Sequence, residues 1–188
     1  KPELLCALGP FEAFCGFSEP ITSVELLHSI GGGASVLARL LTDHDLNHLL
    51  HYMFSGTEEI RILLTDVVEA CAQHDSPHAM WATRLNTRYP NDPAVVASLL
   101  LNHVILSAGE ALYLDPGNLH AYLSGTGVEV MGSSDNVVRC GLTNKHVDIN
   151  ELLATVIARP LPDPVLRPTP VRRTDTGHLW RYETPHAP

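Results

Sequence analysis

Residues 109–122 read Gly109-Glu-Ala-Leu-Tyr-Leu-Asp-Pro-Gly117-Asn-Leu-His120-Ala-Tyr, and this stretch decides how the second half of the chain folds. Its apolar start predicts a strand, and Pro116-Gly117 predicts the tight turn that reverses the strand. The returning strand can direct His120 into a barrel, where a neutral imidazole is able to bind zinc. The alternative interpretation is a histidine packed in the core of the sheet.

Other short apolar runs surround this stretch and predict a region rich in strands. Glycine and Asp/Asn turns separate these runs, which cover Leu99 to Leu106, Ala111 to Leu114, Ala121 to Leu123, Val128 to Met131 and Asn136 to Arg139. Short strands at this spacing are typical of a sandwich or barrel. An apolar and aromatic segment at residues 1–20 predicts one more strand followed by a turn.

Residues 22–97 have the pattern of consecutive helices. The first is expected to begin at a capping box formed by Thr22 and Glu25 and to end at Gly31-Gly32-Gly33. A second helical stretch covers 34–54, and Thr57, Ser76-Pro77 and Asp92-Pro93 have the residues that begin three more helices. After Leu153 the chain contains seven of its 14 prolines, from Pro160 onward, which predicts a linker without regular structure.

Length, charge and cysteine spacing exclude several classes of protein. A chain of 188 residues with net charge −9 has no basic block for a nucleic-acid backbone, and it contains no apolar stretch long enough to span a membrane. No signal peptide is expected at its start, which is not a methionine. Its four cysteines form no Cys-x-x-Cys pair, which favours a reduced, cytoplasmic protein over a thiolate zinc site.

Two further motifs could suggest other sites. His44, His48 and His51 fall on one face of a helix, a spacing that could bind a metal, but we interpret it as a solvated or packing face. Gly31-Gly32-Gly33 is followed by Ala34-Ser35 and lacks the Lys-Ser/Thr of a phosphate-binding loop, so it is interpreted as the end of a helix.

The run Gly127-Val-Glu129-Val-Met-Gly-Ser-Ser-Asp-Asn-Val-Val-Arg139-Cys-Gly-Leu-Thr-Asn-Lys145 is the most specific motif in the chain. It resembles the signature of the type I, zinc-dependent mannose-6-phosphate isomerases, and residues 109–122 have the form of the second cupin motif. The first residues, Lys1-Pro-Glu3-Leu, resemble the end of the family's His-Lys-Pro-Glu segment, and the aromatic run at 11–17 resembles the family's next stretch. Asn144 departs from the family pattern, which usually has proline there.

The resemblance implies an α+β fold, a cupin-type β jelly roll with an all-helical insertion domain. Residues 1–20 and 98–153 would form the two parts of the jelly roll, and 21–97 the helical insertion. Residues 154–188 would form a proline-rich crossover toward a C-terminal jelly roll that this chain lacks. The family holds one zinc ion per subunit with Gln, His, Glu and His, and Glu3 and His120 match the last two of these ligands. Because the first two would lie upstream of Lys1, we expect little isomerase activity from this chain alone.

The resemblance also implies the remaining site residues and the reaction, mannose 6-phosphate to fructose 6-phosphate through an enediol. Arg139 matches the arginine at the reacting carbons, and Lys1, Glu129 and Lys145 match other active-site positions. Elementary chemistry agrees with this assignment, because a guanidinium stabilises an oxyanion and an ammonium can bind the phosphate. Either Glu129 or Lys1 could be the base, and the sequence does not choose between them.

Further expectations arise from these assignments. The side chains of Glu3 and His120 should come within about 3–4 Å of each other, as two ligands of one zinc do. We expect a cytoplasmic monomer whose partner is a small-molecule sugar phosphate, in carbohydrate metabolism and GDP-mannose biosynthesis, with no nucleic-acid or membrane partner. Two alternatives remain at this point: a non-catalytic cupin-type sugar-binding or interaction module with an incomplete metal site, and another cupin metalloenzyme such as an oxygenase.

Overall fold

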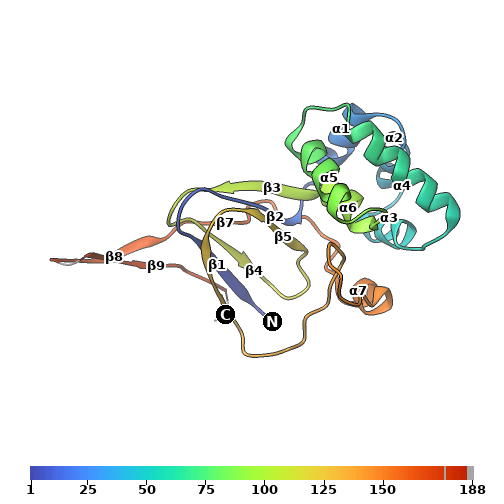
Figure 1. The fold of residues 1–188 in the computed structure, drawn as a ribbon. Helices are drawn as coiled ribbons and strands as arrows, with labels where there is room; N and C mark the ends of the chain where they lie inside the picture. Colours follow the sequence, from blue (N-terminus) through green and yellow to red (C-terminus); the bar gives the residue numbers. More distant parts are fainter. Residues whose placement is uncertain (176, 186–188) are drawn as a thin grey trace. The chain divides into compact units, whose positions relative to one another are not determined.

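The computed structural model describes residues 1–175 and 177–185, and it contains two compact units of different composition (Figure 1). The strand unit is formed by residues 1–16, 102–137 and the chain from Asp163 onward. The helical unit is formed by residues 17–101 and 138–162. The molecule is therefore a mixed helix-and-sheet protein. In the described part, none of the helices combines the length and the apolar character needed to cross a membrane.

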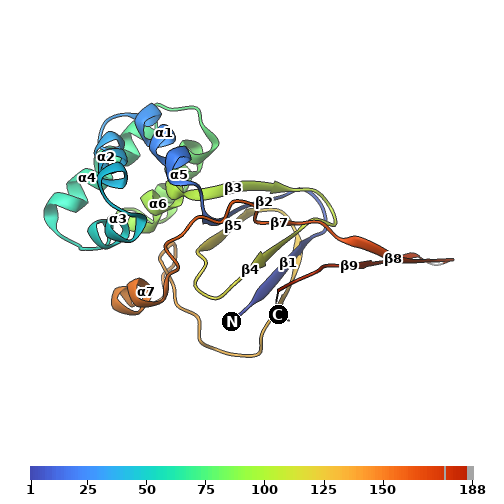
Figure 2. The same ribbon diagram turned by 180° about the vertical axis from the view of Figure 1, so that it is seen from behind.

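The strand unit contains two main sheets, which can be followed from both sides in Figures 1 and 2. The first has the order β6-β1-β4-β7 and consists of β1 (Glu3–Ala7), β4 (Ala111–Leu114), β6 (Gly127–Met131) and β7 (Val165–Leu166). The second has the order β3-β2-β5 and consists of β2 (Phe11–Phe17), β3 (Leu101–Leu106) and β5 (His120–Ser124). Strand β1 is antiparallel to both β4 and β6, so the start of the chain lies inside a sheet.

Buried aromatic and aliphatic side chains explain why these segments form strands. Six of the seven residues of β2 are buried, and all four residues of β4 are buried. Such continuous apolar strands are expected where a strand is covered on both faces. The turn at Pro116-Gly117 forms as predicted, because Gly117 adopts φ 87°, a conformation that other residues rarely take.

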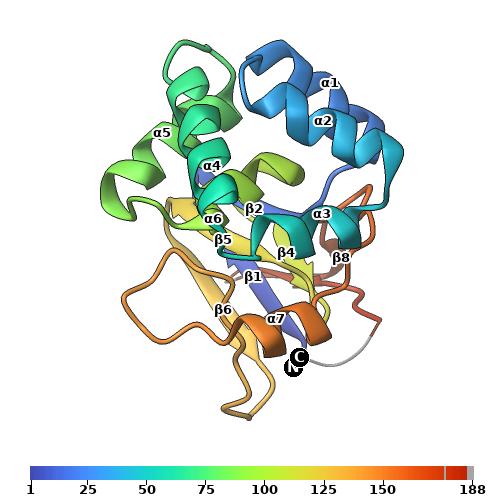
Figure 3. The ribbon, with the colours of Figure 1, turned by 90° about the vertical axis from the view of Figure 1, so that its right-hand side faces the viewer.

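The helical unit begins with two helices, α1 (Pro20–Ile30) and α2 (Ala34–Asp43), that lie side by side (Figure 3). The triple glycine ends α1 as predicted, with Gly31 at its C-cap. The capping box is wrong, however: α1 begins at Pro20, with Glu19 at the cap and no side-chain cap bond. Proline fixes φ near the helical value, so it can begin a helix two residues before Thr22.

The other helices of the unit are α3 (Leu46–Met53), α4 (Glu58–Cys71), α5 (Pro77–Arg88), α6 (Pro93–Ala97), a 3-10 turn at Ser98–Leu100, and α7 (Ile149–Thr155). Thr57, Ser76 and Asp92 cap α4, α5 and α6 through their side chains, as predicted. The expected stretch 34–54 is interrupted, because His44 is extended and Asp45 caps a new helix by accepting a hydrogen bond from the His48 N–H.

Two expectations about the second half of the chain are wrong. Asn136–Arg139 is not a strand: the Val137 N–H donates to the Asp135 carbonyl at 2.8 Å, which closes a local turn. Residues after Pro160 are not an unstructured linker, since they contain β7, β8 (Thr169–Thr174) and β9 (Gly177–Arg181).

Side-chain packing explains why this proline-rich segment has a defined structure. Leu166 and Tyr182 pack against the buried residues Leu4, Ala111 and Tyr113. The Tyr182 hydroxyl also donates to the Gly109 carbonyl at 2.7 Å. Proline is tolerated at the edge of a sheet, and β7 and the β8–β9 hairpin are at such edges.

Candidate metal centre

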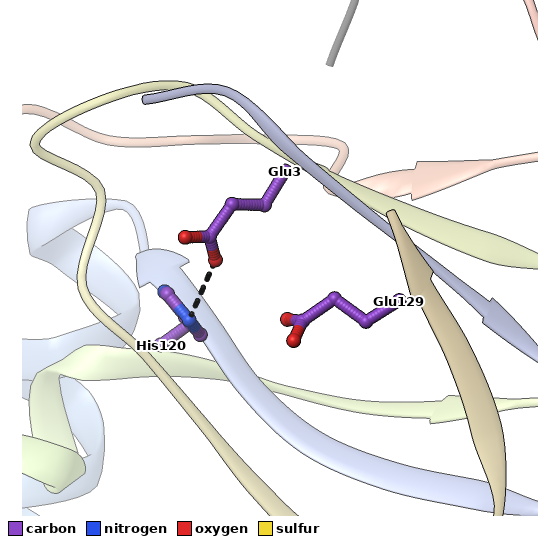
Figure 4. A group of neighbouring side chains, drawn as sticks. All are labelled: Glu3, His120 and Glu129. Carbon is purple, nitrogen blue, oxygen red and sulfur yellow. Dashed lines mark ion pairs between the residues drawn. The ribbon is translucent and has the colours of Figure 1, made fainter. Parts of the chain in front are cut away.

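Glu3 and His120 meet within the strand unit (Figure 4). Glu3 is the first residue of β1 and His120 the first residue of β5, so they come from different sheets. The Glu3 Oε2 and His120 Nε2 atoms are 3.5 Å apart, within the expected range, and the two side chains are 14% and 29% exposed.

Glu129 is the third member of this cluster, and it comes from β6. In the β1–β6 ladder Glu129 lies opposite Leu5, two residues after Glu3. Because side chains alternate along a strand, Glu3 and Leu5 share a face, and Glu129 points to the same side. One ligand atom from each of Glu3, His120 and Glu129 lies within 4.8 Å of the others, and Figure 4 shows the three side chains converging.

The second nitrogen of His120 has a backbone partner. The His120 Nδ1 atom lies 3.3 Å from the Asn118 carbonyl, which can accept a hydrogen bond when Nδ1 carries the proton. In that tautomer Nε2, the nitrogen that faces Glu3, presents its lone pair to the cluster. Metal-binding histidines are commonly oriented in this way by a bond from the other ring nitrogen.

Tyr122 is a neighbour of this cluster that the sequence motifs did not single out. Its hydroxyl donates to the Glu129 Oε1 atom at 2.5 Å, and its ring packs against Phe11 and His120 with centroid distances of 5.5 and 5.4 Å. Burial and, next, the hydrogen bond to Glu129 raise the pKa of the Tyr122 hydroxyl above its usual range, which keeps it a proton donor. Its position two residues after His120 on a strand was the available signal, because such residues share a face.

The cationic site residues of the sequence analysis are outside this cluster. The Lys1 ammonium donates to the Ser134 carbonyl at 2.9 Å, near the start of β1. Arg139 and Lys145 belong to the helical unit, where Arg139 is half-buried and Lys145 exposed. Within the described ranges, the Arg139 guanidinium has no hydrogen bond or ion pair, so the alternative of a salt bridge to Asp135 or Glu129 is not present.

The donor set suits a zinc ion. Zinc binds histidine nitrogen and carboxylate oxygen at about 2.0–2.2 Å in near-tetrahedral geometry, which separates neighbouring ligand atoms by a little over 3 Å. The 3.5 Å between Glu3 and His120 agrees with that separation, and Glu129 is close enough to complete a set of three. Across residues 1–175 and 177–185, this is the only group of three or more such side chains close enough to hold a metal.

Comparison with known proteins agrees with the geometry. The mannose-6-phosphate isomerases of Salmonella typhimurium and Escherichia coli are each 38% identical to this chain, over 179 and 180 residues. Mannose-6-phosphate isomerase 2 of Arabidopsis thaliana is 31% identical over 206 residues. This chain is homologous to the mannose-6-phosphate isomerases. The match to the two bacterial enzymes covers 92% of this chain and 45% of theirs, so the chain spans about half the length of these relatives. No protein-family profile matches the chain.

Solved structures of mannose-6-phosphate isomerase have the same fold over the shared region. The Salmonella typhimurium enzyme bound to fructose 6-phosphate and zinc superposes with a TM-score of 0.79 at 35% identity, covering 92% of this chain and 45% of that one. A mutant of the same enzyme superposes with a TM-score of 0.83 at 32% identity, over 98% and 49% of the two chains. This chain and the Salmonella typhimurium enzyme therefore have the same fold and similar sequences over the shared region.

Proposed function

We propose that this chain contributes the zinc-binding and reacting centre of a mannose-6-phosphate isomerase, which interconverts mannose 6-phosphate and fructose 6-phosphate. The observation that carries this proposal is the convergence of Glu3, His120 and Glu129 from three strands, of which β1 is distant in the sequence from β5 and β6. The homology supports the same conclusion, and it does not favour the non-catalytic module. The free cysteines of the described chain suit a reducing, cytoplasmic setting.

We further propose that the strand unit is a cupin-type jelly roll and the helical unit an insertion into it. The antiparallel pairing of β1 with β4 and β6, and of β2 with β5, supports a jelly roll. The passage of the chain from β2 into the helices and back at β3 supports an insertion. The helical unit also includes residues 138–162, so the proposed boundary after residue 97 describes only the first of its two segments.

In this proposal Glu3 and His120 hold zinc, one ion per subunit. Zinc in such a site supplies a Lewis acid that polarises the sugar carbonyl and the neighbouring hydroxyl. Glu3 contributes a carboxylate and His120 a nitrogen that the Asn118 carbonyl orients. Both side chains are largely shielded from water, which strengthens electrostatic interactions at the site.

Glu129 is proposed as the group that moves the proton between the two sugar carbons. Its carboxylate lies at the cluster, and the Tyr122 hydroxyl fixes one of its oxygens while the other stays available. The Lys1 ammonium donates to a backbone carbonyl, which leaves Glu129 as the better placed base of the two candidates. A base must be within hydrogen-bond reach of the carbon-bound proton, and the cluster is where the sugar carbonyl would lie.

Arg139 and Lys145 are proposed to act on the developing charge and on the phosphate. A planar guanidinium can stabilise the enediol oxygens as negative charge develops, and an ammonium can act as a point charge beside a phosphate. The Arg139 guanidinium is unpaired in the described structure, so it is available for such a role.

Because little turnover is expected from this chain alone, the experiment measures turnover of mannose 6-phosphate by the zinc-loaded protein with the upstream zinc ligands present, followed by the appearance of fructose 6-phosphate. Arg139→Ala should lower kcat by about 10²–10³ with nearly unchanged KM, the usual cost of removing one transition-state donor. Arg139→Lys should recover little, and Arg61→Ala is the matched control because Arg61 forms only an exposed ion pair with Glu58. Absence of turnover when the upstream zinc ligands are present, or an Arg139→Ala variant that melts lower but turns over normally, contradicts the proposal.

Glu129→Gln separates proton transfer from metal binding. If Glu129 is the base, the variant retains zinc, loses turnover, and no longer exchanges the substrate's C2 proton with solvent deuterium. If the variant loses its zinc instead, Glu129 is a metal ligand and the base has to be assigned elsewhere.

A further inference from the structure

Arg139 to Lys145 is a segment of the helical unit that forms neither helix nor strand. One side chain from a distant part of the sequence holds it. The Asp92 carboxylate accepts a hydrogen bond from the Leu142 N–H through Oδ2 at 2.6 Å and from the Ala94 N–H through Oδ1 at 2.9 Å. The second bond caps α6, whereas the first has no role in any helix.

The backbone around Leu142 adopts a conformation that needs such a contact. Leu142 has φ 53°, a region that residues other than glycine seldom occupy unless the surroundings impose it. At the preceding position, a Cβ atom on Gly141 would come within 2.5 Å of the Ala94 Cβ, so only glycine permits this approach to α6. Two adjacent residues are therefore fitted to the first turn of α6.

Cys140, the residue between Arg139 and Gly141, is partly buried. Burial and, to a lesser degree, the nearby Asp92 charge raise the pKa of the Cys140 thiol to about 12. The Cys140 side chain is half-buried, so this part of the segment is partly shielded from solvent.

We propose that Asp92 is a positioning residue: by holding Leu142 against α6 it fixes where the Arg139 side chain is presented. This inference rests on the proposed function for the role of Arg139, but the hydrogen-bonding part of it can be tested without any activity. A cap alone needs one carboxylate oxygen, and here each oxygen has its own backbone N–H. Accepting both hydrogen bonds therefore requires a carboxylate, whereas asparagine would be sufficient for the helix cap alone.

Asp92→Asn makes use of this difference. Asparagine keeps one carbonyl oxygen and so can serve only one of the two N–H groups, while its own NH₂ faces the other. We expect its oxygen to stay on the Ala94 N–H and cap α6, so that the Leu142 N–H loses its acceptor. The matched control is Asp45→Asn, because Asp45 caps α3 by accepting from the His48 N–H alone.

The first readout is amide hydrogen exchange, resolved by residue. Exchange at Leu142 should accelerate by roughly 10- to 100-fold in Asp92→Asn, the range expected for losing a hydrogen bond to a charged group. Ala94 should stay protected there and lose protection in Asp92→Ala, and Asp45→Asn should leave Leu142 unchanged. Leu142 exchange that is unchanged in both Asp92 variants overturns the proposal.

The second readout is a double-mutant cycle with Arg139→Ala. If Asp92 acts through Arg139, Asp92→Asn lowers kcat on its own, and the double variant is no slower than Arg139→Ala. A purely structural role would lower the melting temperature and multiply the two losses of kcat, and this outcome overturns the positioning role. Should the protein show no turnover even with the upstream zinc ligands present, the proposed function fails, while hydrogen exchange still decides whether Asp92 holds the segment.

Discussion

At the scale of single residues, the cluster of Glu3, His120 and Glu129 brings two carboxylates close together, and a bound cation would offset the repulsion between them. Two carboxylates and an imidazole have ligand atoms within 4.8 Å of one another, in a partly buried site. Like charges at this distance repel, and burial weakens the screening by water. The Tyr122 hydroxyl donates a hydrogen bond to Glu129, and the His120 ring lies 3.5 Å from the Glu3 carboxylate. A divalent ion would offset both carboxylates at once.

The first prediction concerns the histidine ligand. His120→Gln should lower zinc affinity by more than the roughly 10–100-fold that loss of an outer hydrogen-bonding partner costs, because a directly bound nitrogen is removed. Isothermal titration with zinc measures this, and the absorption spectrum of the cobalt-loaded protein should lose intensity. His44→Gln, an exposed histidine of the helical unit, is the control. Equal affinities for the two variants would show that His120 is not a ligand.

The second prediction concerns Cys71, which is buried in α4. Burial raises the pKa of its thiol from 9.0 to about 11. A raised folded-state pKa favours the neutral thiol, so its contribution to stability is complete below pH 9 and is lost as the pH rises toward 11. Urea unfolding under reducing conditions should therefore show a shallower loss of stability over this range in Cys71→Ala, by up to about 1.4 kcal/mol per pH unit. Parallel pH profiles for the two proteins would contradict this.

Residues of the site differ in how far the sequence alone could predict them. His120 could be inferred from its strand and turn, and Tyr122 could have been inferred from strand alternation. The close approach of the Glu3 and His120 side chains was expected only because both residues match a family's ligand positions. No local sequence pattern links two strands that belong to different sheets. Asp92 was predicted as a helix cap, but its second partner, Leu142, is set by tertiary packing.

At the scale of elements, the N-terminal end of α2 lies close to α4 at Gly33, its N-cap residue. A Cβ atom on Gly33 would come within 3.0 Å of the Leu63 backbone carbonyl and side chain and 2.9 Å of the Asp66 carboxylate. Gly33 has an ordinary helical conformation, with φ −59°, so alanine would be compatible with the backbone itself. The contact with α4 is therefore the reason for glycine at this position.

The third prediction concerns this contact. Gly33→Ala should destabilise the protein by about 1–3 kcal/mol through overpacking, although alanine favours helix formation. Thermal or urea unfolding measures the change. Gly9→Ala is the matched control, because a Cβ at Gly9 meets nothing within 4 Å and its φ is not positive. A stabilised Gly33→Ala variant would show that α2 and α4 are farther apart in solution.

The elements that the sequence predicted well are those with local signals. Side-chain caps located the starts of α4, α5 and α6, because a cap depends on residues within one turn. The strands after Pro160 were not predicted because proline disfavours regular structure. In the folded chain, Leu166 and Tyr182 pack against side chains of strands that are distant in the sequence. Residues 136–139 were expected to form a strand from two adjacent valines, but a turn at Asp135 intervenes.

At the scale of the whole molecule, neither unit is continuous in sequence. The strand unit is assembled from three segments and the helical unit from two. The candidate metal ligands all belong to the strand unit, and Arg139 and Lys145 belong to the helical unit. Metal binding by the cluster is therefore expected to act directly on the strand unit.

The last prediction tests this expectation through stability. A ligand that binds only the folded state at 100 times its dissociation constant stabilises that state by about 2.7 kcal/mol. Zinc should therefore slow amide exchange in β1, β5 and β6, which carry the three cluster residues. Exchange in α4 and α5 should change much less, because the described helices contribute no member of the metal cluster.

Two variants make the outcome specific. His120→Gln should abolish the added protection in the strand unit. The combined His44→Gln, His48→Gln and His51→Gln variant should preserve both that protection and the zinc content, since among the described residues these histidines are not part of a group close enough to hold a metal. Protection that appears first in α2 and α3, or a loss of stoichiometric zinc in the triple variant, would move the metal site to the helical unit. Equal slowing in both units would instead show that they open together, because a ligand bound to one part of a cooperative structure stabilises all of it.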